Sequence, residues 1–144
     1  MQIESPAFVH NKPIPIRYTC QGEDVSPPLE FKNIPNGTKS LALIVDDPDA
    51  PNGTFDHWIV WNLPAQGGLL EDAKVAKQGK NHFGDSRYGG PCPPPGKPHR
   101  YFFKLYALDT TLDLPNGISK KQLEAAMEGH ILAKAELIGT YQKG

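Results

Sequence analysis

Short apolar runs that end at acidic or proline-rich turns dominate the pattern of the chain. Residues 40–45 (SLALIV) form one such run, which stops abruptly at Asp46-Asp47-Pro48. Residues 57–63 (HWIVWNL) and 100–108 (RYFFKLYAL) are rich in aromatic and β-branched side chains, and prolines bound them. Runs of this length and composition are typical of buried strands. The pattern therefore predicts three core strands, with the acidic turn at the end of the first.

Weaker segments extend this prediction. Residues 14–19 are split by Pro15 and fit an edge strand, and residues 29–32 fit a short strand before a Pro-Asn-Gly turn. Residues 133–137 alternate apolar and polar side chains but have a helix-favouring composition, and we favour a strand. Residues 70–77 are a candidate for one or two helical turns without a strong cap.

One helix is predicted after Asn116-Gly117. Ser119 is suited to be the N-cap, and Gln122 follows three residues later, as in a capping box. Gly129 is a natural stop for this helix. Together, the elements predict a mostly β, mostly antiparallel fold with one or two peripheral helices and long loops.

Composition narrows the class of protein. The chain has 144 residues, with no internal repeat or linker, so we expect a single domain over residues 1–144. It contains 15 Pro and 14 Gly, spread along its length, which indicates a turn-rich fold rather than a disordered one. The net charge of −1 gives no sign of a nucleic-acid surface, so no nucleic-acid partner is expected.

Location and redox state follow from two further features. No apolar run approaches the ~20 residues of a transmembrane segment, and the first residues lack the basic and apolar stretches of a signal peptide. We therefore expect a cytoplasmic protein. Cys20 and Cys92 are too few for a disulfide-built scaffold and too far apart for a C-x-x-C pair. The sequence is compatible both with a single disulfide between these cysteines and with a pair of free thiols.

Candidate chemistry gathers first in the turn Asp46-Asp47-Pro48-Asp49-Ala50-Pro51. Its two prolines fix φ and restrict the residues before them, so the carboxylates lie in a stiff loop. A solvated Asx-Pro turn is the alternative interpretation. Three aspartates within four positions, beside two prolines, favour a preorganised site.

His57 opens the second predicted strand. Strict alternation places its side chain on one face with Ile59 and Trp61, and puts Trp58, Val60 and Asn62 on the other. A histidine at this place is also compatible with an ordinary hydrogen-bonded rim position.

A Gly/Pro loop over residues 88–98 leads into the third strand. Its glycines allow backbone N–H groups to approach a small oxyanion, and its prolines keep the loop from collapsing. After the loop, His99 and Tyr101 share one strand face, whereas Arg100, Phe102 and Lys104 share the other. A structural Pro-rich connection is the alternative interpretation.

Taken in order, these three segments resemble the signature of the phosphatidylethanolamine-binding protein (PEBP) family, which includes the Raf kinase inhibitor proteins. Segments 18–29 and 129–141 are similar to its compact bacterial and archaeal branch. The matching motifs are Asp47-Pro48-Asp49-Ala50-Pro51, His57-Trp58, Gly90-Pro91, Pro94-Pro95-Gly96 and His99-Arg100-Tyr101.

The resemblance implies a large antiparallel sheet packed on a smaller one, with a small anion pocket at one end. That pocket would take phosphate-like and carboxylate-like groups, including phospholipid headgroups, without a cofactor. It also implies a cis peptide bond at Ala50-Pro51. A regulated kinase or protease and a second copy of the chain, as a homodimer, are the protein partners that it suggests. The residues that would line the pocket are Asp47, His57, Gly90, Pro91, His99 and Tyr101.

Three functions compete at this stage. A regulatory binding module is favoured because no nucleophile has a recognisable base: Cys92 lies between prolines, and Ser86 has no partner in the motifs. An enzyme is the alternative, since Asp47, His57 and His99 could form a two-His, one-carboxylate metal site. A structural protein with a vestigial pocket is the third.

Overall fold

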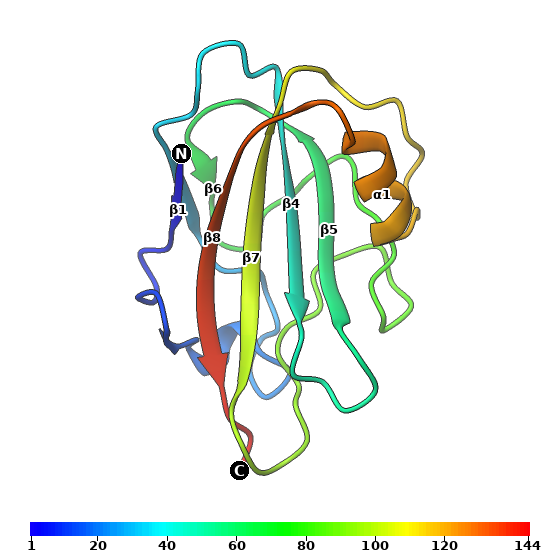
Figure 1. Ribbon diagram of the computed structural model, residues 1–144. Helices are drawn as coiled ribbons and strands as arrows, with labels where there is room; N and C mark the ends of the chain where they lie inside the picture. Colours follow the sequence, from blue (N-terminus) through cyan, green and yellow to red (C-terminus); the bar gives the residue numbers. More distant parts are fainter.

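A computed structural model describes all 144 residues as a mostly β fold with two sheets, one short α-helix and one 3₁₀ turn (Figure 1). No helix in it is long and apolar enough to cross a bilayer. The elements are β1 (Gln2–Glu4), β2 (Lys12–Pro13), η1 (Ile16–Tyr18), β3 (Leu29–Lys32), β4 (Ser40–Asp47), β5 (Phe55–Leu63), β6 (Gly68–Leu69), β7 (His99–Leu108), α1 (Lys120–Met127) and β8 (Ile131–Tyr141).

The larger sheet has five strands in the order β2-β8-β7-β4-β5. All neighbours are antiparallel except the short β2, which runs parallel to β8. Because β4 is antiparallel to both its neighbours, its C-terminal end lies beside the first residues of β5 and β7. This arrangement brings the three chemistry-bearing segments of the sequence to one end of the sheet.

The smaller sheet has the order β1-β3-β6 and packs on the larger one. A cluster of 19 buried residues fills the space between the two sheets. It combines Ile3 and Phe31 of the small sheet with Leu43, Val60 and Leu105 of the large sheet. Burial of these apolar side chains holds the two layers together, at about 25 cal/mol per Å² of apolar surface removed from water.

The helix α1 covers part of the opposite face of the large sheet (Figure 1). Ser119 caps it as predicted: its hydroxyl accepts from the Gln122 backbone N–H, and the Gln122 side chain accepts from the Ser119 N–H. Leu123 and Met127 are fully buried against Ile44 and Trp61 of the sheet. The cap and the apolar face together fix the start and the orientation of this helix.

Two local predictions are wrong. Residues 70–77 form turns and irregular structure instead of a helix, and Leu70 is 85% exposed. The segment has no strong cap and is shorter than the helices that are stable by themselves. No strand forms over residues 14–19: residues 16–18 form the 3₁₀ turn η1, in which Tyr18 N–H bonds back to the Pro15 carbonyl. The strand predicted at residues 133–137 is confirmed as part of β8.

Candidate functional site

A cavity of about 540 Å³ lies at the end of the large sheet where β4 stops and β5 and β7 begin. Four of the predicted residues line it: Asp47 from β4, His57 from β5, and His99 and Tyr101 from β7. The strand order β7-β4-β5 places the two histidines on either side of Asp47. The topology therefore assembles a polar cluster from positions far apart in the sequence.

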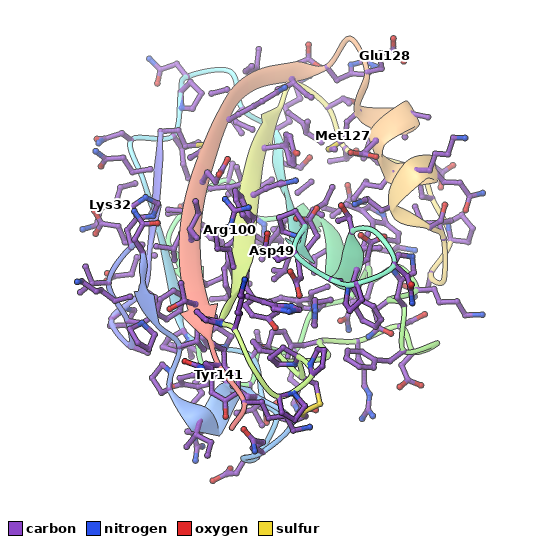
Figure 2. All side chains as sticks on the ribbon, turned by 60° about the horizontal axis from the view of Figure 1, so that its bottom comes forward. Lys32, Asp49, Arg100, Met127, Glu128 and Tyr141 are labelled. Carbon is purple, nitrogen blue, oxygen red and sulfur yellow. A yellow bond between two sulfur atoms is a disulfide. The ribbon has the colours of Figure 1, made fainter.

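Asp47 is buried, and its two carboxylate oxygens are both engaged. Oδ1 accepts from the Asp49 backbone N–H at 2.8 Å, and Oδ2 accepts from His99 Nδ1 at 2.7 Å. Asp49 in turn is held by Arg100, whose guanidinium lowers the pKa of the Asp49 carboxyl (Figure 2). The stiff turn thus orients His99 through the Asp47 carboxylate.

The turn after Asp47 corrects one expectation. The structure contains no cis peptide bond, so Ala50-Pro51 is trans. Gly53 N–H bonds to the Ala50 carbonyl at 3.3 Å, and Gly53 takes a positive φ of 104°. A trans bond is the lower-energy form for X-Pro, and a turn closed in this way does not require the other isomer.

A β-bulge places His57 in the pocket. Val45 pairs with Trp58 and Asp46 pairs with Asp56, which leaves His57 without a partner on β4. The prediction from strict alternation, with His57 on the face of Ile59 and Trp61, is therefore wrong. The extra residue turns the His57 ring toward Tyr101, with 5.2 Å between ring centroids. Bulges commonly redirect a side chain in this way beside functional sites.

The Gly/Pro loop fixes the tautomer of His57. Because the Gly89 carbonyl can only accept, His57 Nδ1–H must donate to it, at 2.7 Å. Burial is the main cause that lowers the pKa of His57, since it disfavours the charged ring. His57 is therefore neutral near pH 7, with an unprotonated Nε2.

Gly90 and Pro91 are not among the residues that line the cavity, although the Gly90 backbone lies against the His57 ring. Gly90 N–H donates to Asp24 Oδ1 at 2.7 Å, and the Pro91 carbonyl accepts from Cys20 N–H at 3.1 Å. A Cβ on Gly90 would lie 2.2 Å from the Tyr18 carbonyl oxygen. These two residues anchor the loop to the segment around η1, and the close approach of the Tyr18 backbone accounts for a glycine at residue 90. Their contact with a ligand stays a prediction.

Tyr101 forms the buried floor of the pocket. Its hydroxyl has no hydrogen-bond partner in the structure. Burial, and then the negative charge of Asp47, raise the pKa of Tyr101, so the hydroxyl stays protonated. It is a neutral donor next to the Asp47 carboxylate.

A disulfide joins Cys20 to Cys92, which resolves the choice left open by the sequence. Cys92 lines the pocket together with Pro93 and Pro94, and the sulfur pair is visible at this end of the molecule in Figure 2. The bond ties the pocket loop to the segment after η1. It therefore limits the movement of one wall.

An aromatic rim completes the pocket and was not predicted from the sequence. Phe55 stacks edge-on against both His82 and Phe83, and Phe83 is 47% exposed. Buried Asn81 holds the short loop that carries His82 and Phe83, by accepting from the Phe83 and Asp85 N–H groups. The sequence Asn-His-Phe-Gly alone does not predict a binding site, so only the tertiary structure reveals that this segment lies at the pocket rim.

The residues do not form a metal site. No group of three or more His, Cys, Asp or Glu side chains has an arrangement that could hold a metal ion. Both Asp47 oxygens already accept from protein donors, the Asp49 backbone N–H and His99 Nδ1. The geometry thus does not support the two-His, one-carboxylate alternative.

Comparison with known proteins decides the family. The sequence profile described as "Phosphatidylethanolamine-binding protein" matches residues 4–142 of the chain. The chain belongs to the PEBP family. A UPF0098 protein of Methanothermobacter thermautotrophicus is 49% identical over 100% of both chains, and one of Chlamydia muridarum is 53% identical over 99% of both. These relatives place the chain in the compact prokaryotic branch of the PEBP family, as the motifs indicated.

Solved structures of PEBP proteins have the same fold. A crystal structure of a PEBP homolog from Chlamydia trachomatis matches with a TM-score of 0.95 at 49% identity, covering 99% of this chain and 97% of that one. E. coli YbcL, described as a new member of the mammalian PEBP family, matches with a TM-score of 0.91 at 33% identity, covering 99% and 98%. The predicted PEBP fold is confirmed. The kinase, protease and homodimer partners, and the cytoplasmic location, stay predictions.

Proposed function

We propose that this PEBP protein is a small-anion binding module whose pocket takes phosphate-like or carboxylate-like groups. One observation carries the proposal: two histidine rings from separate strands line one cavity, each with Nδ1 bonded to the protein and no partner on Nε2. Imidazole supplies an N–H donor when its nitrogen is protonated, and its protonation adds a positive charge. Such a pair of histidines is suited to bind an oxyanion.

The size and walls of the pocket support the same function. A volume of about 540 Å³ lies within the range of ordinary small-molecule sites. Thr54 and Asn52 offer polar side chains at the rim, and Pro93, Pro94 and the disulfide make one wall stiff. A stiff pocket loses little conformational entropy when a ligand binds.

Binding by these histidines depends on pH. As the pH falls from about 8 to 6, an imidazole gains a proton more readily, and an anion in the pocket favours this protonation. The negative charge of Asp47 partly offsets the effect of burial on the pKa of His57 but also repels an anion, although both of its oxygens accept from protein donors. We expect the affinity for phosphate to rise over this pH range.

Isothermal titration of inorganic phosphate at pH 8 and pH 6 tests the proposal. We expect His99→Ala to weaken binding by about 10- to 100-fold, the value of a hydrogen bond to a charged group. His130→Ala is the matched control, because His130 also bonds to an aspartate, Asp109, but lies at the far end of the sheet. Binding without pH dependence, or unchanged binding in His99→Ala, would overturn the proposal.

A further inference from the structure

The pocket contains no permanent positive charge. Its fifteen lining residues include three histidines and one carboxylate but no lysine and no arginine. The Arg100 guanidinium is held by Asp49 on the other face of β7, and the Lys143 ammonium lies outside the lining, 3.8 Å from Cys92 Sγ. Among the side chains that line the cavity, only a protonated histidine can therefore present a full positive charge to an anion.

Both central histidines present acceptors in their neutral forms. The Gly89 carbonyl fixes the hydrogen of His57 on Nδ1, and the Asp47 carboxylate does the same for His99. In a neutral ring with its hydrogen on Nδ1, Nε2 carries a lone pair. An oxyanion oxygen can face such a nitrogen favourably only if a proton lies between them.

The other ionisable groups around these rings do not remove the need for a proton between Nε2 and the oxyanion. His82 accepts the Asp56 backbone N–H on Nδ1, and its Nε2 lies 3.5 Å from Asp56 Oδ2. Tyr101 stays protonated, for the reasons given above, and Asp47 adds negative charge. Asp46 faces the opposite side of the sheet, where it meets Lys104 and Lys120. Neutral donors at the rim, Asn52 and Thr54, serve all oxyanions alike.

We propose that the pocket selects oxyanions that carry an O–H group, so that inorganic phosphate binds in preference to sulfate and to phosphodiesters. This inference rests on the proposed function and specifies its ligand class. Hydrogen phosphate donates its O–H to one Nε2 and needs at most one ring to take a proton from solution. Sulfate and a phosphodiester have no O–H, and each must draw one more proton onto the rings.

Titration calorimetry with phosphate, sulfate and dimethyl phosphate tests this selection. Each anion is measured at pH 7 and pH 8, in two buffers of different ionisation enthalpy, to count the protons taken up. We expect sulfate to take up one more proton than phosphate. The ratio of phosphate to sulfate affinity then grows by about tenfold from pH 7 to pH 8. Dimethyl phosphate, which represents a lipid headgroup diester, should also bind more weakly than phosphate at pH 8.

The outcomes separate the two proposals. Equal proton uptake and equal affinity of phosphate and sulfate at pH 8 would overturn the selection and leave the anion-binding function in place. Binding of none of the three anions, at pH 6 as well, would overturn both. Stronger binding of dimethyl phosphate than of phosphate would also reject the selection and favour a headgroup ligand.

A variant of His99 distinguishes a role of its ring in anion selection from a purely structural role. His99→Gln replaces the imidazole by an amide whose NH₂ group stays protonated and can donate both to Asp47 and to the anion. We expect sulfate to take up about one proton fewer in this variant, and its affinity to depend less on pH. His130→Gln is the control and should leave both quantities unchanged. Unaltered proton uptake in His99→Gln would contradict the inference.

Discussion

Asp46 and Asp47 are neighbours in the chain, yet their carboxylates lie on opposite faces of the large sheet. Asp47 faces the pocket and accepts from His99, whereas Asp46 faces α1, with Lys104 at 3.0 Å and Lys120 at 3.3 Å. Both carboxylates are almost fully buried. The alternation of β4 thus divides two adjacent charges between the pocket and the ion pairs beneath the helix.

The helix anchor gives the first prediction. Lys120 also lies 2.7 Å from Asp56 Oδ1, so one ammonium compensates two buried carboxylates. Lys120→Met removes this ammonium from both carboxylates, and we expect a loss of about 3 kcal/mol in the free energy of unfolding. Chemical denaturation at pH 7 measures this loss. The neighbouring Lys121 is exposed and forms no ion pair, so Lys121→Met should change stability little; equal effects of the two variants would refute the anchor.

The negative charge of Asp47 gives the second prediction. Asp47→Asn keeps an oxygen that can accept from His99 but removes the negative charge that partly offsets the effect of burial on the pKa of His57. We expect the midpoint of the pH dependence of phosphate binding to move about one pH unit lower. Titration calorimetry in half-unit pH steps measures this shift. Asp49→Asn is the control, because Arg100 already balances that carboxylate; a midpoint that does not move in Asp47→Asn would argue against coupling.

The buried ring of His57 makes stability depend on pH. Its pKa is lowered in the folded protein, so below the ordinary value of 6.5 the unfolded chain binds a proton that the folded chain excludes. The free energy of unfolding should therefore fall as the pH drops through 6.5 toward the folded pKa.

His57→Gln removes this titration. Between pH 6.5 and 5.5, the variant should lose about 1 kcal/mol less stability than the parent protein. Urea denaturation at the two pH values gives the difference directly. Parallel losses in parent and variant would mean that His57 already carries a proton in the folded state.

The disulfide provides a fourth prediction. Cys20 and Cys92 close a loop with a sequence separation of 72 residues, and loop-closure entropy predicts that the bond stabilises the fold by about 4 kcal/mol. The double variant Cys20→Ser, Cys92→Ser should unfold at a lower denaturant concentration and bind phosphate more weakly, because the pocket wall is less fixed. Dithiothreitol should have the same effect on the parent protein and none on the double variant.

Much of the fold could be predicted from local patterns. The long strands β4, β5 and β7 have strong apolar and aromatic runs, and the Ser119–Gln122 pair defines the start of α1. The strands β1, β2 and β6 could not be found this way. They contain only two or three residues each, and pairing with distant partners, not composition, makes them strands.

The site was predictable in its residues but not in its geometry. The motifs led to Asp47, His57, His99 and Tyr101, all of which line the cavity. The orientation of His57 depends on a bulge that only the pairing of β4 with β5 creates. Gly90 was predicted from the freedom that glycine gives to close approach, and the neighbour that approaches it in the structure is the Tyr18 backbone, which no local pattern could identify.

Histidine NMR tests the account most directly. The chain has five histidines, and long-range ¹H–¹⁵N spectra distinguish the two ring nitrogens of each. When inorganic phosphate is added at pH 7, we expect the Nε2 resonances of His57 and His99 to move, while Nδ1 of both stays protonated and His10 and His130 do not respond. Unmoved His57 and His99 resonances at saturating phosphate would contradict the assignment of this pocket as an anion site.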